Sequence, residues 1–221
     1  MPAGPSAPRL MAAVDDLPPV RLAVTGAPGT GRHTVCTALA LATGLDCATV
    51  SAELTAPRSG RRLGDTVEAT VRGFEQRVDT ETRMPGGFVS DGSVLHEWAM
   101  AEALRQTRRL RHWVLNPRDL PYRIFEQRFL LAHHRIVIRR ANDTYDGVVH
   151  LRLPDDAGAG DDGALRAVVD RLLLATLHES ALPYLVIGGS IEQIVAQVAG
   201  MYQLPQRIPV GDAVSAALRA A

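Results

Sequence analysis

The stretch RLAVTGAPGTGRHTVCTALALATG, residues 21–44, decides how this chain folds. A short apolar run leads into the glycine-rich turn GAPGTG. Apolar residues at 35, 38, 39 and 42 then recur at the spacing of one helical face. Gly44 is expected to end that helix, because glycine commonly follows the last helical residue. The stretch therefore predicts a strand, a tight turn and an amphipathic helix in succession.

The turn fits the first six positions of the phosphate-binding pattern G-x-x-x-x-G-K-[ST] and departs from it at the last two. Arg32 stands at the lysine position, His33 at the serine or threonine position, and Thr34 follows one place late. A strand, a glycine-rich turn and a helix start bring backbone N–H groups and the positive end of a helix dipole around an anion. We therefore expect this loop to bind the phosphates of a nucleotide. The residues expected to do so are Gly26, Ala27, Gly29, Thr30, Gly31, Arg32, His33 and Thr34.

The two departures affect different parts of the expected chemistry. The usual lysine reaches the β- and γ-phosphates, and the usual hydroxyl binds Mg²⁺. Arg32 keeps the charge on a longer, planar side chain, whereas His33 is a poor ligand for this oxygen-seeking ion. Thr34 lies about 100° further around the helix, so it does not simply replace the hydroxyl. Four interpretations of the loop are therefore possible at this point: a working nucleotide site, a modified nucleotide site, a site that has lost its function, and a glycine turn that binds no nucleotide.

Composition limits the function classes. The formal net charge is zero and 22% of residues are charged, whereas a nucleic-acid-binding protein usually carries a basic excess. No apolar run approaches the roughly 18–20 residues of a membrane span, so we expect neither nucleic acid nor a membrane as a partner. Cys36 and Cys47 form no CxxC motif and are expected to be buried thiols in a reduced, cytoplasmic setting. The chain contains no lysine, so a general drift from lysine to arginine could account for Arg32.

The order of the expected elements is β-α-β-α-β-α-α-β-α-β-α, with the second strand expected over 46–52 and the helix after the third strand over 91–106. Strands that alternate with helices indicate an α/β fold with a parallel sheet. We expect a single P-loop NTPase domain over residues 19–204, with a five-stranded parallel sheet and helices on both faces. Residues 1–18 are expected to be a flexible tail, and 205–221 a tail or a short helix.

Five segments carry a resemblance to a known family. They are GAPGTG (26–31), FVSDGS (88–93), YDGVVHLRLP (145–154), DDGALRAVVDRLL (161–173) and LPYLVIGGSIEQIV (182–195). From about residue 21 to 201 the chain resembles the P-loop nucleoside and nucleotide kinases, and the AAA-type bacterial ATPases similar to ribosylnicotinamide kinases. The resemblance implies a phosphotransferase that uses ATP or GTP with Mg²⁺. The implied acceptor is a small molecule such as a nucleoside or nucleotide, and a homodimer is left open.

The resemblance also implies catalytic roles. Glu53 would act on the acceptor hydroxyl, and Asp91 would help to hold Mg²⁺ and the acceptor. Arg32 would serve the phosphates, and Thr34 is a second candidate Mg²⁺ ligand. Gly92 stands where the family usually has an arginine after the acidic residue, which is a third departure beside those at Arg32 and His33. The three departures together argue against ordinary turnover.

Further roles fall on the second half of the chain. A lid at about 154–170 would contribute arginines that neutralise charge on the moving phosphoryl group. Arg166 and Arg171 are the candidates, with Arg152 a weaker one. Gly188 and Gly189, after the last strand, would pack against the nucleotide base.

Each assignment has an alternative without catalysis. Asp91 could be a helix N-cap, which is a common place for aspartate. Glu53 could be a surface charge, and the lid arginines could form the solvated face of a helix. The sequence therefore also leaves room for a catalytically impaired pseudo-kinase that acts as a binding or regulatory protein.

Overall fold

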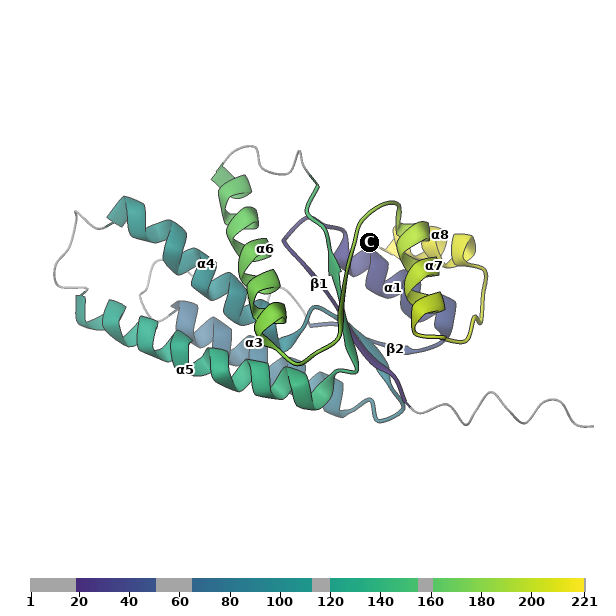
Figure 1. Cartoon of the computed structure of the whole chain (residues 1–221), viewed down its shortest axis with the longest axis horizontal. Helices are drawn as coiled ribbons and strands as arrows, with labels where there is room; N and C mark the ends of the chain where they lie inside the picture. Colours follow the sequence, from purple (N-terminus) through teal and green to yellow (C-terminus); the bar gives the residue numbers. More distant parts are fainter. Residues whose placement is uncertain (1–18, 51–64, 113–119, 155–160, 221) are drawn as a thin grey trace, which may run out of the picture.

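Five parallel strands form the centre of the molecule (Figure 1). The computed structural model describes residues 19–50, 65–112, 120–154 and 161–220. The strands are β1 (Arg21–Gly26), β2 (Asp46–Ala48), β3 (Phe88–Asp91), β4 (Gly147–Leu151) and β5 (Tyr184–Ile187). They lie side by side in the order β2-β3-β1-β4-β5. The expected α/β fold with a five-stranded parallel sheet is confirmed.

The helices cover both faces of this sheet (Figure 1). One face carries α1 (Arg32–Thr43), α7 (Ile191–Met201) and α8 (Val210–Ala220). The other carries α3 (Asp65–Thr82), α4 (Val94–His112), α5 (Leu120–Thr144) and α6 (Asp161–Glu179). Within the described residues, no helix has the length and apolar content needed to cross a membrane.

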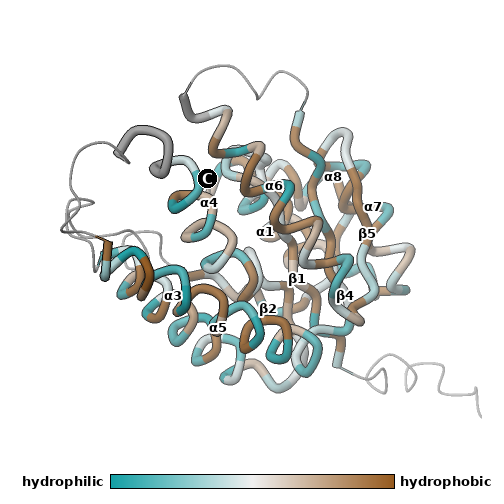
Figure 2. Tube along the Cα trace, turned by 60° about the vertical axis from the view of Figure 1, so that its left-hand side comes forward, coloured by the Kyte–Doolittle hydropathy of each residue, from teal (hydrophilic) through white to brown (hydrophobic). Residues whose placement is uncertain are grey.

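Strand β1 lies between the two hydrophobic cores. Successive side chains of a strand point to opposite faces of the sheet. Leu22 and Val24 accordingly pack with α1, α7 and α8, while Ala23 packs with α4, α5 and α6. Because both faces are covered, the strand reads as a nearly continuous apolar run. Figure 2 shows hydrophobic residues along these central strands.

Several boundaries differ from the sequence-based expectation. Helix α4 was expected to begin at Asp91, but the structure begins it at Val94. Strand β2 ends at Ala48, earlier than the expected strand over 46–52. Beyond Pro205 the structure has helix α8, which packs against α1 through Ala213, Val214 and Ala217. The expected N-terminal tail, residues 1–18, lies outside the described residues.

Gly87 is required at the turn before β3. It has a φ of 98°, and a Cβ added there would lie 2.7 Å from the carbonyl oxygen of Val20 and 2.9 Å from its nitrogen. We expect Gly87→Ala to destabilise the protein by about 1–3 kcal/mol or more, because both backbone strain and a backbone clash oppose the methyl group. Urea unfolding would measure the change. Gly86→Ala is the matched control, since a Cβ at Gly86 meets nothing within 4 Å. An equal loss in the two variants would contradict this explanation.

Candidate functional site

The loop between β1 and α1 has the geometry of an anion-binding turn. Gly29 and Gly31 have φ values of 86° and 76°, which favour glycine. The backbone N–H of Thr30 donates to the carbonyl of Ala27 at 3.3 Å, and its hydroxyl donates to the same oxygen at 2.9 Å. Among the described residues, no side chain caps the start of α1 at Gly31. The first-turn N–H groups of a helix have no partner within it, so those of α1 are available to an anion.

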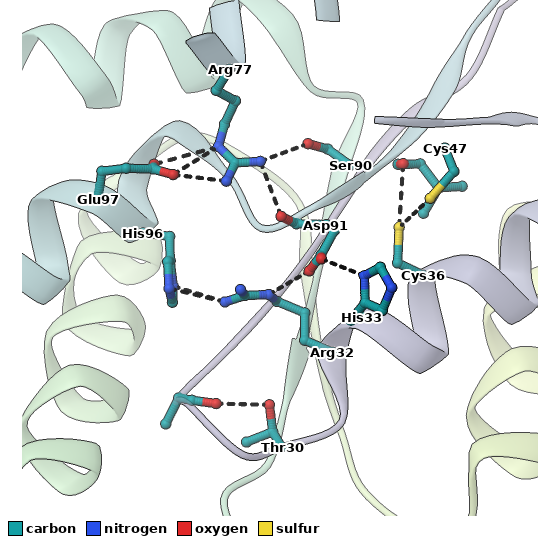
Figure 3. A network of polar contacts seen from close by, with 12 residues as sticks. Thr30, Arg32, His33, Cys36, Cys47, Arg77, Ser90, Asp91, His96 and Glu97 are labelled. Atoms are coloured by element: carbon teal, nitrogen blue, oxygen red, sulfur yellow. Dashed lines mark hydrogen bonds and ion pairs between the residues drawn. The ribbon is translucent and has the colours of Figure 1, made fainter. Parts of the chain in front are cut away.

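The two unusual loop residues both contact Asp91 (Figure 3). Arg32 donates from Nε to one carboxylate oxygen of Asp91 at 2.6 Å. Nδ1 of His33 lies 2.9 Å from the other oxygen. Burial raises the pKa of Asp91, but the charges and hydrogen bonds of Arg32 and His33 outweigh it and leave this pKa below its ordinary value. The loop thus brings two basic side chains onto one ionised carboxylate.

His96 holds the far end of Arg32. The NH1 nitrogen of Arg32 lies 3.0 Å from Nε2 and 3.1 Å from Nδ1 of His96. Burial lowers the pKa of His96 well below its usual range, and the positive charges of Arg32 and Arg77 lower it further. A neutral imidazole has one nitrogen that accepts a hydrogen bond, so His96 can accept from the guanidinium. We call Arg32, His33, Asp91 and His96 the Asp91 cluster.

Asp91 does not cap helix α4. The helix begins three residues later at Val94, where the backbone N–H of Leu95 donates to the hydroxyl of Ser93 at 3.2 Å. Asp91 is instead the last residue of β3, paired with Val24 of β1. The N-cap interpretation of Asp91 is therefore wrong, because its two oxygens face α1.

Arg77 of α3 supports the turn after β3, and sequence reasoning missed it. Its guanidinium donates to Glu97 at 2.7 Å, to the hydroxyl of Ser90 at 3.2 Å and to the carbonyl of Asp91 at 3.0 Å. A Cβ on Gly92 would lie 3.0 Å from this guanidinium. Gly92 has no side chain and thus leaves room for the guanidinium of Arg77. Arg77 shares the buried face of α3 with Ala69 and Gly73, and that placement was the available signal.

Buried hydrogen bonds of Glu81 and Tyr145 also stabilise the turn after β3. Glu81 accepts from the hydroxyl of Ser90 at 2.8 Å and from that of Tyr145 at 2.7 Å. The Tyr145 oxygen accepts from the backbone N–H of Val94 at 3.1 Å. Burial raises the pKa of Glu81 and raises that of Tyr145 well above its usual range. These contacts tie α3, β3 and the start of α4 together around the Asp91 turn.

The arginines expected to act from a lid lie in different places, and residues 155–160 of that expected lid lie outside the described residues. The guanidinium carbon of Arg166 is 3.5 Å from the position of a Cβ on Gly29, so this side chain lies over the glycine turn. Arg171 instead donates to Gln106 of α4 at 3.1 Å. Arg152 follows β4 and lies beside Gly188: a Cβ added to Gly188 would lie 3.4 Å from the Cβ of Arg152.

Of the remaining expected site residues, the structure describes Gly188, Gly189 and Thr34. Gly188 and Gly189 are exposed between β5 and α7, at the same edge of the sheet as the loop. Glu53 lies outside the described residues. Thr34 is half-buried in the first turn of α1. In the part of the chain that the structure describes, no three His, Cys, Asp or Glu side chains are grouped so that they could hold a metal ion.

A buried histidine connects α6 to the sheet below the loop. His150 of β4 is fully buried, with Nδ1 3.2 Å from the hydroxyl of Thr25 and Nε2 3.0 Å from Asp170 of α6. Asp170 is one helical turn after Arg166. Burial lowers the pKa of His150 despite its contact with Asp170. The contact holds the part of α6 that places Arg166 over the turn.

Comparison with known proteins identifies a similar fold. Neither the family profiles nor the curated proteins compared with this sequence match it. The chain is similar to the solved structure of a deoxyadenosine kinase from M. mycoides with bound dCTP. The TM-score is 0.50 at 10% identity, over 83% of this chain and 99% of the kinase. The chain therefore shares the fold of a P-loop nucleoside kinase.

Proposed function

We propose that this protein is a nucleotide-binding phosphotransferase that moves the γ-phosphate of ATP or GTP to a small metabolite such as a nucleoside or nucleotide. One observation carries the proposal: Arg166 lies over a glycine turn whose helix start is uncapped in the described chain. Arg32 and His33, the next two residues of the chain, add two basic side chains beside this turn, where both contact Asp91. The shared fold with a deoxyadenosine kinase supports it. A cytoplasmic location belongs to the same proposal.

The proposed chemistry is positioning and charge neutralisation, which dominate phosphoryl transfer. The amides of the turn would hold the phosphates, while Arg32 and Arg166 would offset the charge that develops on the moving group. Once Arg32 and His33 contact the phosphates instead of Asp91, the Asp91 carboxylate would accept a hydrogen bond from the acceptor hydroxyl and orient it. Glu53 stays a proposed contact to the acceptor, and Gly188 and Gly189 stay proposed contacts to the base.

Magnesium fits the described residues poorly. Proteins usually hold Mg²⁺ through one or two carboxylates together with substrate phosphates. Here both oxygens of Asp91 are engaged by Arg32 and His33, and His33 stands in place of the hydroxyl ligand. We therefore propose that nucleotide binding depends less on Mg²⁺ here than in an ordinary P-loop kinase.

The alternative is a pseudo-kinase that binds nucleotide and acts through protein contacts. The engagement of Asp91 by two basic side chains favours it, because an acid held in this way is not free to act on an acceptor.

Thermal unfolding in the presence of ATP or GTP tests nucleotide binding. A ligand at a hundredfold excess over its Kd should add about 2.7 kcal/mol of stability. We expect this gain with EDTA as well as with Mg²⁺. An assay of γ-phosphate transfer to a panel of nucleosides and nucleotides then separates the kinase from the pseudo-kinase. Failure of every triphosphate to raise the melting temperature would contradict both.

The two lid arginines offer a matched test of the loop. Arg166→Ala should weaken triphosphate binding about tenfold, the effect of losing one charge-assisted hydrogen bond of about 1.5 kcal/mol. Arg171→Ala removes the same side chain from the same helix but only a contact to Gln106, so binding should change less than twofold. Isothermal titration of both variants measures the difference. Equal losses would remove Arg166 from the site.

A further inference from the structure

Cys36 and Cys47 form a thiol pair next to the Asp91 cluster (Figure 3). Cys36 lies on α1 and Cys47 on β2, and their sulfurs are 3.3 Å apart. The thiol of Cys36 also lies 3.3 Å from the carbonyl of Val89, to which it can donate. Cys36 is buried and Cys47 is half-buried, so the expectation that both would be buried is wrong for Cys47.

The pair is coupled to the loop through two elements. Cys36 follows His33 by three residues on α1, so both lie on one side of the helix. Val89, the acceptor for Cys36, precedes Asp91 by two residues on β3. A movement of the Cys36 sulfur therefore acts on both elements that meet in the Asp91 cluster.

The two thiols differ in reactivity. The hydrogen bond with Cys47 and burial raise the pKa of Cys36 well above its usual value. The same hydrogen bond lowers the pKa of Cys47. Since the thiolate is the nucleophile, and since Cys47 is the more exposed sulfur, Cys47 is the group that meets an oxidant first.

We propose that Cys36 and Cys47 are an oxidation site that closes to an intramolecular disulfide, and that this bond lowers the affinity of the nucleotide loop. The second part rests on the proposed function, and the first part does not. The oxidant class is a hydroperoxide.

The oxidation proceeds in two balanced steps. The Cys47 thiolate attacks the terminal oxygen of the peroxide and the O–O bond breaks, so that Cys47 becomes a sulfenic acid. Hydroxide leaves from hydrogen peroxide, and an alkoxide leaves from an organic hydroperoxide. The sulfur of Cys36 then attacks the sulfur of Cys47, and the S–O bond breaks. The departing hydroxide takes the Cys36 proton and leaves as water. Two thiols lose two electrons, and the peroxide gains them.

The bond would rearrange the start of α1. A disulfide requires a sulfur separation of about 2.05 Å, so the two sulfurs must close from 3.3 Å. Cys36 also loses the proton that it can donate to Val89. Closure of the sulfurs would draw Cys36 of α1 toward Cys47 of β2, and loss of the hydrogen bond would release Cys36 from Val89 of β3. We expect both changes to shift the first turns of α1 and so to disturb the alignment of Arg32 and His33 with Asp91.

The first measurement follows the thiols of the full chain after treatment with hydrogen peroxide. We expect denaturing thiol titration to show the loss of both thiols, and dithiothreitol to restore them. The chain should remain monomeric, and mass spectrometry should find the peptide that holds Cys36 and Cys47 lighter by two hydrogens. Cys36→Ser should instead retain a sulfenic acid at Cys47 that dimedone traps. Cys47→Ser should leave Cys36 unreacted over the same time. Thiols that persist, or disulfides only between chains, would overturn the proposal.

The second measurement compares ATP affinity before and after oxidation. We expect a loss of about tenfold that dithiothreitol reverses and that neither serine variant shows. A disulfide that forms without change in affinity would overturn the regulatory part alone. Reduced protein that binds no triphosphate would overturn both that part and the proposed function, while the thiol titration would still decide whether the oxidation site exists.

Discussion

Arg77→Ala is expected to destabilise the protein by about 3–5 kcal/mol, the cost of breaking a buried ion pair on one side. The side chains of Arg77 and Glu97 are only 3% and 7% exposed, and they meet at 2.7 Å. Alanine would leave the Glu97 carboxylate buried without its counter-charge. It would also leave the Asp91 carbonyl and the Ser90 hydroxyl without this donor. Urea unfolding would measure the loss.

The matched control for this prediction lies just beyond the end of the same helix. Arg83 follows α3 and pairs with Asp79, but these side chains are 75% and 61% exposed. Arg83→Ala should therefore change stability by less than about 1 kcal/mol. Adding Glu97→Gln to Arg77→Ala should recover part of the loss, because it removes the buried charge. If the single and double variants were equally unstable, the buried carboxylate would not be the cause.

Arg32→Ala is expected to lower triphosphate affinity about a hundredfold. The substitution removes a cation that we propose for the phosphates. It also removes the main counter-charge of Asp91, whose carboxylate would then repel the same phosphates. Two losses of about 1.4 kcal/mol each would give a hundredfold change. Titration with ATP measures it, and Arg83→Ala serves again as an arginine control away from the loop.

Two further variants separate these contributions. Arg32→Ala with Asp91→Asn should bind better than Arg32→Ala alone, because the repelling carboxylate is gone. No recovery would show that repulsion by Asp91 plays no part. Arg32→Lys with His33→Ser rebuilds the ordinary loop pattern. A loop adapted to arginine and histidine should bind no better after this change, whereas a decayed relic should gain Mg²⁺-dependent ATP binding.

The early elements of the fold were predictable because their signals are local. The apolar spacing on α1 and the glycines around it act within a few residues of the chain. Gly44 has a φ of 79° and ends α1, as its position predicted. Strand and helix alternation then limited the architecture to a parallel sheet. The start of α4 was placed too early, because Asp91 and Ser93 are both residues that favour a helix N-cap.

The network around the loop could not be read from the sequence. Asp91 meets Arg32 across 59 positions, and Glu97 meets Arg77 across 20. Such contacts depend on which strands are neighbours and on the rotation of each helix. The four-residue spacing of Ala69, Gly73 and Arg77 indicated that they share one face of α3, but no local feature of the sequence indicated that Arg77 is buried there against Glu97. Charged residues are rarely buried unless they are paired.

The sequence by itself determined the strand, the glycine turn and the helix at the start of the chain, since backbone preferences and apolar periodicity act locally. It also identified Arg32 and His33 as departures from the phosphate-binding pattern and Asp91 as a candidate site residue. Only the tertiary structure decided that these three meet in one ion-paired cluster, that Arg77 lies beside Gly92, and that Arg166 lies over the turn. The physical reason is that the packing of β3 against β1, and of α3 and α6 onto the sheet, brings distant charges together where they neutralise one another.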